Sequence, residues 1–377
     1  MSKLYLPNAS QFDLMNENLA KIANAIGSDI DISTWAGIQK AVRVGIAPDL
    51  MPVGTQLSVN HSVYGEMLYD VVAHNHFKSA HDKNAHTMTL MCHDNLATLV
   101  PFDAPEAFYY ANTALSAGTY NFTLSSTYSS WEAGTYQFTL SQGLPEGGQL
   151  VFLVGASTPL SGSYIDSLAD RYTDTPMEIA VISKGNEGTS LGTLGVELNN
   201  LHRIVFGSNN YKESAIRQFL NSSSPAGSVW KPQTKFDRSP GMITLEGFMK
   251  GLDSDFLAVV GEVIVPCASM GTYESPDSTI VAGTKYTVTD KFYIASQHEI
   301  FGTTTGNVTD ESVLFPYYEG ATKADYIKYR QGVAGKWWTR TPYHGNASNV
   351  NYVESTGDIG NANARSSYGC SPICNIV

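Results

Sequence analysis

An eight-residue motif that occurs twice is the feature that most restricts the fold of this 377-residue chain. The segment AGTYNFTL at 117–124 recurs as AGTYQFTL at 133–140. In each copy Tyr, Phe and Leu alternate with Thr and with Asn or Gln, which is the period of a strand with one buried face. Two such segments in succession predict a pair of antiparallel strands. Because two copies are too few for a solenoid, we expect a β-rich, sandwich-like insertion at about 101–200.

The overall composition also favours strands and loops over long helices. Only 15% of the residues are charged, whereas the chain contains 33 Gly and 21 Tyr. Such a composition suits β-rich, loop-rich proteins better than helical bundles. The formal net charge of −12 argues against non-specific binding to nucleic acid or to anionic membranes.

The first 49 residues predict a short helical segment. Apolar residues recur at steps of three and four over 10–27, as in an amphipathic helix that ends at Gly27. A second helix is expected within 33–48, capped by Ser33 or Thr34 and ended by Gly45 and Pro48. Its inward-facing residues are expected to be Ile38, Ala41 and Val42.

From residue 50 the pattern becomes mixed, with strands interrupted by a few helices. Residues 53–77 predict a hairpin, and 86–102 contain a further strand. A helix is expected at 209–222, with Asn209 or Asn210 as its cap, Asn221 as its end, and an apolar face. Residues 289–302 predict a strand followed by a turn, and STGD at 355–358 predicts a further turn.

Nothing in the sequence forms a recognised catalytic motif. The histidines crowd between His74 and His93, but their spacing matches no standard zinc site, so a metal there is permitted without being required. P-loop and dinucleotide-binding motifs are absent from the sequence, and the glycine-rich GTSLGTLG at 188–195 is followed by no clear helix, so a loop is expected there. Carboxylates near 246–262 leave paired-acid catalysis open, with solvated charges as the ordinary interpretation. We therefore expect no enzyme activity, no cofactor and no metal.

Four cysteines, Cys92, Cys267, Cys370 and Cys374, are too few for a disulfide scaffold and are expected to be free, buried thiols. The N-terminus lacks a basic region followed by an apolar run, so no secretion signal is expected. The sequence also lacks an apolar stretch of about 18 residues, which argues against membrane insertion.

The segment from Trp337 to Val377 has the most specific composition in the chain. It begins with WWTRTP and continues with Asn, Ser, Gly, Ala and Tyr, among scattered apolar residues that would bury well. Such a mixture matches adaptable recognition surfaces, in which Tyr gives rigid contacts and Ser, Gly and Asn give versatile hydrogen bonds. An Asn-rich network of structural loops is the alternative. Within 349–353, apolar and polar residues do not alternate cleanly, so the outward-facing side chains stay undecided.

Four segments, in order along the chain, resemble a C-type-lectin-like family related to the formylglycine-generating enzyme fold. They are an opening hairpin at 52–75, the helix NNYKESAIRQFLN at 209–221, the segment TDKFYIASQHEI at 289–300, and a closing pattern that includes WWTRTP, VNYVESTG and YGCSPIC. The resemblance implies an α+β fold: a C-type-lectin-like domain over 50–377, interrupted by the insertion at about 101–200. The tail at 337–377 resembles those of variable proteins of diversity-generating retroelements.

The resemblance implies that this chain, like members of that family, carries a binding surface of replaceable side chains on a fixed scaffold. The scaffold residues would be Trp337, Trp338 and Arg340, with Arg340 bridging backbone carbonyls or a carboxylate. The corresponding variable, ligand-contacting residues are Tyr343, His344, Gly345, Asn346, Ser348, Asn349, Asn351, Tyr352, Asn361, Asn363, Arg365, Ser366, Ser367 and Tyr368.

The resemblance therefore implies a ligand- or receptor-recognition protein, phage- or prophage-encoded, that binds a protein or glycan on a target cell surface. It would be located on the phage tail or the surface of a virion, or in the bacterial cytoplasm before assembly. By analogy with phage tail-tip proteins it would form a homotrimer. Two alternatives stay open: a structural phage tail or decoration protein without variable binding, and an oxidase of the formylglycine-generating type.

Overall fold

The computed structural model describes a β-rich chain with short helices, which is compatible with the expected α+β class. The helix expected over 10–27 lies outside the described residues. These are 30–103, 106–110, 113–124, 132–144, 149–153, 164–165, 179–194, 201–202, 209–226, 245–268, 285–304, 311–344 and 349–377.

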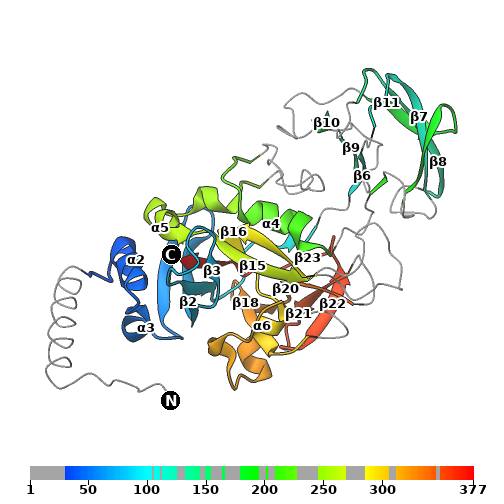
Figure 1. Ribbon diagram of the computed structural model, residues 1–377. Coiled ribbons are helices and arrows are strands. Elements are labelled where there is room, and N and C mark those ends of the chain that lie inside the picture. Colours follow the sequence, from blue (N-terminus) through cyan, green and yellow to red (C-terminus); the bar gives the residue numbers. More distant parts are fainter. Residues whose placement is uncertain are drawn as a thin grey trace, which may run out of the picture.

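The largest sheet joins strands from both ends of the described chain (Figure 1). The predicted hairpin is confirmed, because β1 (Gln56–His61) and β2 (Gly65–His74) pair antiparallel. The strand expected in 86–102 is β4 (Met88–Cys92), which lies between β2 and the last strand, β24 (Ile373–Ile376). Two short strands also pair with β24: β14 (Val260–Gly261) and β17 (Phe292–Tyr293). The C-terminal strand therefore lies inside the sheet, with partners on both sides.

Two three-stranded sheets and two short ribbons complete the main body. One sheet has the order β16 (Lys285–Asp290), β15 (Val263–Ala268) and β3 (Lys78–Ser79). The other, which we call the tail sheet, has the order β20 (Trp337–Pro342), β21 (Asn349–Val353) and β22 (Ile359–Asn363). The ribbons pair β18 (Lys328–Arg330) with β19 (Val333–Gly335), and β5 (Val100–Pro101) with β23 (Ser367–Tyr368).

The helix predicted within 33–48 is present as α2 (Trp35–Arg43). The Thr34 side chain caps it by accepting a hydrogen bond from the backbone of Gly37, and Ile38, Ala41 and Val42 are buried as expected. Pro48 does not end this segment, because it lies near the start of a second helix, α3 (Ala47–Leu50), where its missing N–H costs nothing. Trp35 of α2 packs on Phe256 with ring centroids 4.6 Å apart.

The helix expected at 209–222 is divided in two. Tyr211–Glu213 form a 3-10 turn capped by Asn210, and Ser214 then caps α4 (Ala215–Leu220), which ends at Asn221. The break follows from two successive capping side chains, each of which satisfies its own helix start. Arg217 of α4 reaches the carboxylate of Asp290 at the end of β16 through three hydrogen bonds of 2.8–3.0 Å.

A further correction concerns 289–302, where a helix replaces the expected turn. After β17 the chain forms α6 (Gln297–Phe301), which begins at Ser296 with a capping box: Ser296 accepts from the Glu299 backbone, and Glu299 accepts from the Ser296 backbone. The other helical elements among the described residues are α5 (Ser254–Val259) and 3-10 turns at Phe248–Gly251, Pro316–Tyr318 and Lys323–Tyr326.

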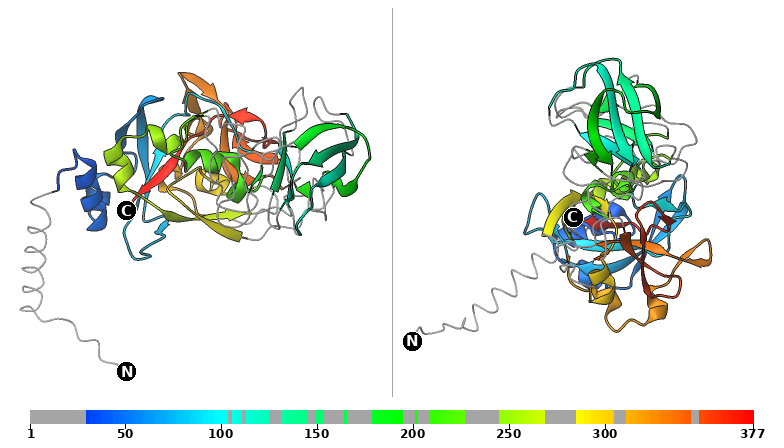
Figure 2. Two further views of the ribbon diagram at one scale, coloured as in Figure 1. Left: turned by 90° about the horizontal axis from the view of Figure 1, so that it is seen from above. Right: turned by 90° about the vertical axis from the view of Figure 1, so that its right-hand side faces the viewer.

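The strands within the expected insertion form two four-stranded sheets. One has the order β10 (Tyr164–Ile165), β9 (Gln149–Leu153), β6 (Glu106–Tyr110) and β13 (Leu201–His202). The other has the order β11 (Ile179–Lys184), β8 (Gly134–Leu140), β7 (Gly118–Leu124) and β12 (Thr189–Leu194). These strands lie together at the end of the molecule opposite α2 (Figure 2).

The repeated motif forms the antiparallel pair that its alternation predicts. Strands β7 and β8 pair along their whole length, with Tyr120 opposite Phe138 and Phe122 opposite Tyr136. These four aromatic side chains are buried, while Thr119 and Thr123 contact Thr139 and Thr135 on the other face. Each copy of the motif therefore contributes half of one apolar face of the sheet.

Candidate functional site

The tail sheet carries most of the residues expected to bind a ligand. Its strands β21 and β22 pair without interruption from Asn349 opposite Asn363 to Val353 opposite Ile359. The predicted turn at 355–358 connects them, with the backbone of Gly357 donating to Glu354. Gly357 has a φ of +80°, a conformation that favours glycine. Residues of each strand therefore alternate between the two faces of the tail sheet.

Both tryptophans of the WWTRTP segment are fully buried and hydrogen-bonded. Trp338 donates its indole N–H to Val100 O at 2.9 Å and packs against the ring of Phe102, with centroids 5.8 Å apart. Trp337 donates its indole N–H to Tyr326 O at 3.1 Å. Both residues thus attach β20 to segments that precede it in the chain.

Arg340 has the environment expected of a structural arginine. Its guanidinium is buried and donates to both oxygens of Glu299, at 2.7 and 2.5 Å, and to the carbonyls of Ile294 and Pro266. A second buried carboxylate, Glu311, lies 3.9 Å from the Arg340 Nε. The bidentate pair attaches β20 to α6, and the hydrogen bond to the Pro266 carbonyl attaches it to β15.

The two carboxylates beside Arg340 have opposite pKa shifts. Burial raises the pKa of Glu299, but Arg340 and hydrogen bonds outweigh this effect and lower it to about 2. For Glu311, burial outweighs Arg340 and the hydrogen bonds from Thr341 and from the Ala268 backbone, and the pKa rises to about 7. The paired Glu299 is therefore ionised at neutral pH, whereas Glu311 gains or loses a proton near it.

We expect this buried acid to make the protein less stable as the pH rises toward 7. Glu311 has an ordinary pKa of 4.5, so between pH 4.5 and about 7 the folded chain keeps a proton that the unfolded chain has lost. The free energy of unfolding should fall across this window, by roughly 3 kcal/mol in total from this group.

Urea denaturation of the protein and of Glu311→Gln at pH 5, 6, 7 and 8 would measure this effect. Burial lowers the pKa of His61 and of His74, and these residues add stability as the pH rises through the same range. Both proteins contain these histidines, so the difference between the two profiles isolates Glu311. Parallel profiles would contradict the assignment.

One face of the tail sheet presents a group of asparagine side chains. Asn349 donates to Asn361 Oδ1 at 2.9 Å, and Asn363 donates to Asn349 Oδ1 at 2.7 Å. Asn361 is exposed, and the other two are half-buried. The three amides hold one another in place while keeping further donors and acceptors for a ligand. We call Asn349, Asn361 and Asn363 the asparagine cluster.

Tyr343 and His344 extend this face at the end of β20. Their rings lie 4.7 Å apart, and both side chains are half-buried. The backbone N–H of Tyr343 donates to Asn349 O, and the side chain of Asn209 donates to the same carbonyl at 3.0 Å. Asn209 is therefore a fixed support for this edge. Gly345, Asn346 and Ser348 lie outside the described residues.

The opposite face of the tail sheet carries an aromatic cluster. The rings of Trp338, Tyr352 and Tyr368 contact one another, and Lys336 Nζ lies 4.9 Å from the Tyr352 centroid. The Tyr352 hydroxyl donates to Glu354 at 2.6 Å and accepts from Lys336 at 3.1 Å. Tyr352 covers Gly360, where an added Cβ would lie 2.5 Å from the tyrosine ring. Tyr352 is 5% exposed, so it belongs mainly to the scaffold.

Asn351 corrects the expected set of contact residues. It is 1% exposed and donates to the Gln297 side chain of α6 at 2.9 Å, so it supports the sheet and cannot meet a ligand in this structure. The unclear alternation of 349–353 has the same origin: α6 covers one face at Asn351, and the aromatic cluster covers the other at Tyr352. The positions after β22 differ: Arg365 and Ser367 are exposed, and Ser366 and Tyr368 are half-buried.

The histidines between His74 and His93 do not converge on one site. His74 contacts Met51 O, His76 contacts Ser312 Oγ, and His86 contacts Asn75, in each case through a side-chain nitrogen. His93 pairs with Asp70 at 2.8 Å. Among the described residues, no three His, Cys, Asp or Glu side chains come together in a metal-binding arrangement.

All four cysteines are free and buried, as the sequence predicts. Burial raises the pKa of Cys92 to about 12 and keeps those of Cys370 and Cys374 well above their ordinary value. A thiol reacts through its thiolate, so these side chains are poor nucleophiles at neutral pH.

Lys336, Glu354, Gln297 and Asn209 support the tail sheet but were not expected from the sequence. The S-x-x-E pattern at 296–299 is a signal that could have placed Gln297 on a helix.

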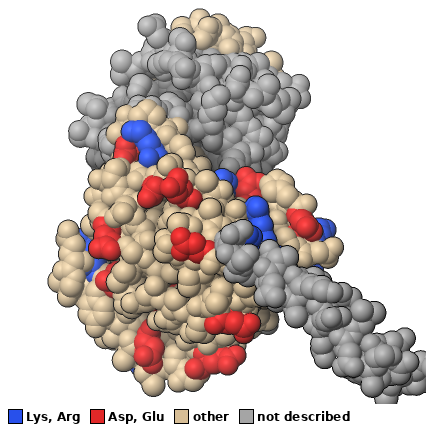
Figure 3. Space-filling view, turned by 90° about the vertical axis from the view of Figure 1, so that its left-hand side faces the viewer, with Lys and Arg blue, Asp and Glu red and all other residues tan. Residues whose placement is uncertain are grey.

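On the face shown in Figure 3, acidic side chains lie scattered over a mostly uncharged surface. None of the helices in the described part of the chain has the length and apolarity needed to cross a lipid bilayer.

The fold and the tail define a β-rich protein whose C-terminal sheet is held on a buried Arg–Glu core. The chain belongs to the family described as a domain of unknown function (DUF6273), whose family model matches residues 181–377. The matched region starts inside the insertion, and three strands that precede it, β1, β2 and β4, share a sheet with β24. No curated protein and no solved structure matches this chain.

Proposed function

We propose that this chain is a non-enzymatic ligand-recognition protein that presents a diversifiable surface on a C-type-lectin-like scaffold. The surface consists of the asparagine cluster with Tyr343, His344, Arg365, Ser366 and Ser367 as neighbours. The ligand would be a protein or glycan on a target cell. The protein would be a phage- or prophage-encoded component of a virion, a trimer by analogy with tail-tip proteins.

The separation of an amide cluster at the sheet surface, one exposed and two half-buried, from a buried scaffold is the observation that carries this proposal. The asparagine cluster makes its mutual bonds at the sheet surface, whereas Trp337, Trp338 and Arg340 are 0% exposed and bonded to distant segments. Exposed substitutions of this kind cost little stability, so side chains there can change while the fold persists.

The positions of the family-like segments support the C-type-lectin-like part of the proposal. They form the β1–β2 hairpin, α4, the β17–α6 unit, and the tail sheet with β24, in the order in which the resemblance has them. The buried, weakly acidic Cys370 and Cys374 give no support to a thiol-based oxidase.

Adsorption of the labelled protein to a panel of bacterial cells would test the recognition surface. We expect the double variant Asn361→Ala, Asn363→Ala to lose about tenfold or more in cell binding while its stability changes by less than ~0.5 kcal/mol. The matched control is Asn60→Ala, an exposed asparagine on β1. Cell binding that survives the double variant would favour a structural phage protein over a tail-directed binder.

The surrounding genome provides a separate test of diversification. A nearby reverse transcriptase gene, with a near-copy of the 3′ coding end that differs at adenines, is the expected finding. The absence of both would rule out the retroelement form of the proposal but would leave ligand recognition to the adsorption experiment.

A further inference from the structure

The first half of strand β2 has a strand partner on only one side. It pairs with β1 from Gly65 to Asp70, but its pairing with β4 begins at Tyr69. The last ladder contact on that side is the His93 N–H, which donates to Leu68 O at 2.8 Å. The chain then turns away, and the Asn95 N–H donates to Tyr329 O instead. Among the described residues, the β2 edge from Gly65 to Leu68 therefore has no neighbouring strand on the side opposite β1.

The geometry of an antiparallel ladder shows where the free groups of this edge point. Backbone groups two residues apart face the same side of a strand, so Glu66 directs its N–H and C=O the same way as Leu68. Among the described residues, the Glu66 backbone has no hydrogen-bond partner on that side. Such groups form a ready template for an added strand.

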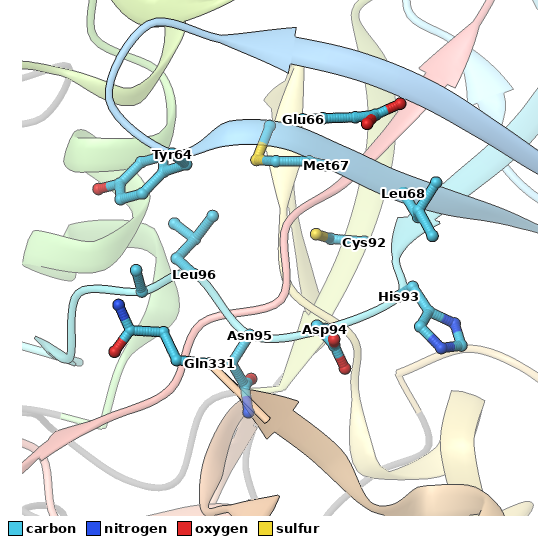
Figure 4. A pocket seen from close by; sticks show the side chains of 11 residues that line it. Tyr64, Glu66, Met67, Leu68, Cys92, His93, Asp94, Asn95, Leu96 and Gln331 are labelled. Carbon is cyan, nitrogen blue, oxygen red and sulfur yellow. The ribbon is translucent and has the colours of Figure 1, made fainter. Parts of the chain in front are cut away.

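A pocket of about 310 Å³ lies beside this free edge. Met67, Cys92 and Leu96 lie between β2 and the segment that follows β4, as Figure 4 shows. These three side chains are buried and form an apolar floor. The volume is at the lower end of the range for ligand pockets, which suits two or three residues of an extended chain.

Two of the residues that line the pocket are acidic, Glu66 and Asp94, and both are exposed at its rim. The Glu66 carboxylate accepts a hydrogen bond from Ser58 of β1, and the buried carboxylate of Asp70, outside the lining, pairs with His93. The nearby ammonium of Lys328 is already engaged, because it donates to Cys92 O and His93 O at 2.6 and 2.8 Å. The rim therefore favours a cationic group over an anion.

We propose that this pocket binds the amino-terminal end of an extended peptide by strand addition to β2. The peptide backbone pairs with the N–H and C=O of Glu66. An apolar side chain occupies the floor at Met67 and Leu96, and the terminal ammonium lies at the acidic rim. Main-chain pairing supplies affinity and the side-chain pocket supplies specificity, as in other β-augmentation sites. This site is independent of the proposed tail surface.

The test uses the full chain and the tripeptide amide Lys-Val-Thr, titrated by calorimetry. We expect binding in the range of about 0.1–1 mM, and about tenfold weaker binding of N-acetyl-Glu-Val-Thr amide. A Lys-Val-Thr peptide methylated at the valine nitrogen lacks the N–H that pairs with Glu66 O and should also bind about tenfold more weakly.

Two variants locate the site without disturbing the core. Glu66→Lys reverses an exposed charge, and Asp94→Asn keeps the Oδ1 acceptor for the Tyr329 N–H; each should weaken binding about fivefold or more. The matched control is Glu319→Lys, an exposed glutamate outside the pocket lining, which should bind like the parent protein. The asparagine-cluster double variant should bind normally too. Absence of peptide binding, equal binding of the methylated peptide, or unchanged binding by Glu66→Lys would overturn the proposal.

Discussion

Replacement of Arg340 with methionine is expected to lower the free energy of unfolding by about 3–5 kcal/mol. The guanidinium is the cationic partner of Glu299 and lies beside Glu311, and all three residues are buried. Without it, one ionised carboxylate stays in the core without a counter-charge. Urea denaturation at pH 7 would measure the loss.

A second variant keeps this prediction testable if Arg340→Met does not fold. Replacing both partners, in Arg340→Met, Glu299→Met, removes the buried charge as well as its partner and should recover a large part of the lost stability. The matched control is Arg330→Met, a half-buried arginine that donates to Ala97 O at 3.3 Å and should cost less than about 1 kcal/mol. Equal losses of stability in the Arg340 and Arg330 variants would contradict a large contribution of the buried Arg340–Glu299 pair to the free energy of unfolding.

The second large effect is expected at Trp338. Trp338→Ala should cost about 3–5 kcal/mol, because the indole is fully buried, donates to Val100 O, and contacts Phe102, Tyr352 and Tyr368. Thermal and urea unfolding would measure the change.

The comparison with the asparagine cluster makes this prediction specific to the tail. Asn361→Ala changes an exposed side chain of the same sheet and should stay within about 0.5 kcal/mol of the parent protein. Similar costs at Trp338 and Asn361 would contradict a division of the tail into scaffold and surface.

Local patterns were sufficient to predict the elements whose signals lie close together in the chain. The Thr34 cap with the apolar face of α2, and the alternation of the β7–β8 motif, each combine residues within one segment. The helix α6 also had such a signal, because Ser296 and Glu299 form a capping box, but the preceding strand pattern favoured a turn.

The core of the site depends on contacts that local patterns do not contain. Arg340 meets Glu299, which is 41 residues away, and Trp338 meets Val100, which is 238 residues away. The composition of the tail suggested a recognition surface but could not separate Asn361 from Asn351. That difference arises because Gln297 of α6 covers Asn351, a tertiary contact that no period in the strand reveals.

The position of β24 makes folding depend on an intact reading frame through the tail. This strand lies between β4 and two short strands, β14 and β17, and it follows the whole tail sheet in the sequence. Residues 343–368 must therefore be translated in frame before β24 can be synthesised and can enter the largest sheet. A frameshift or an early stop in that region removes a central strand and leaves β4 with an open edge, which favours aggregation or degradation. Only copies with an intact reading frame would then reach the folded state.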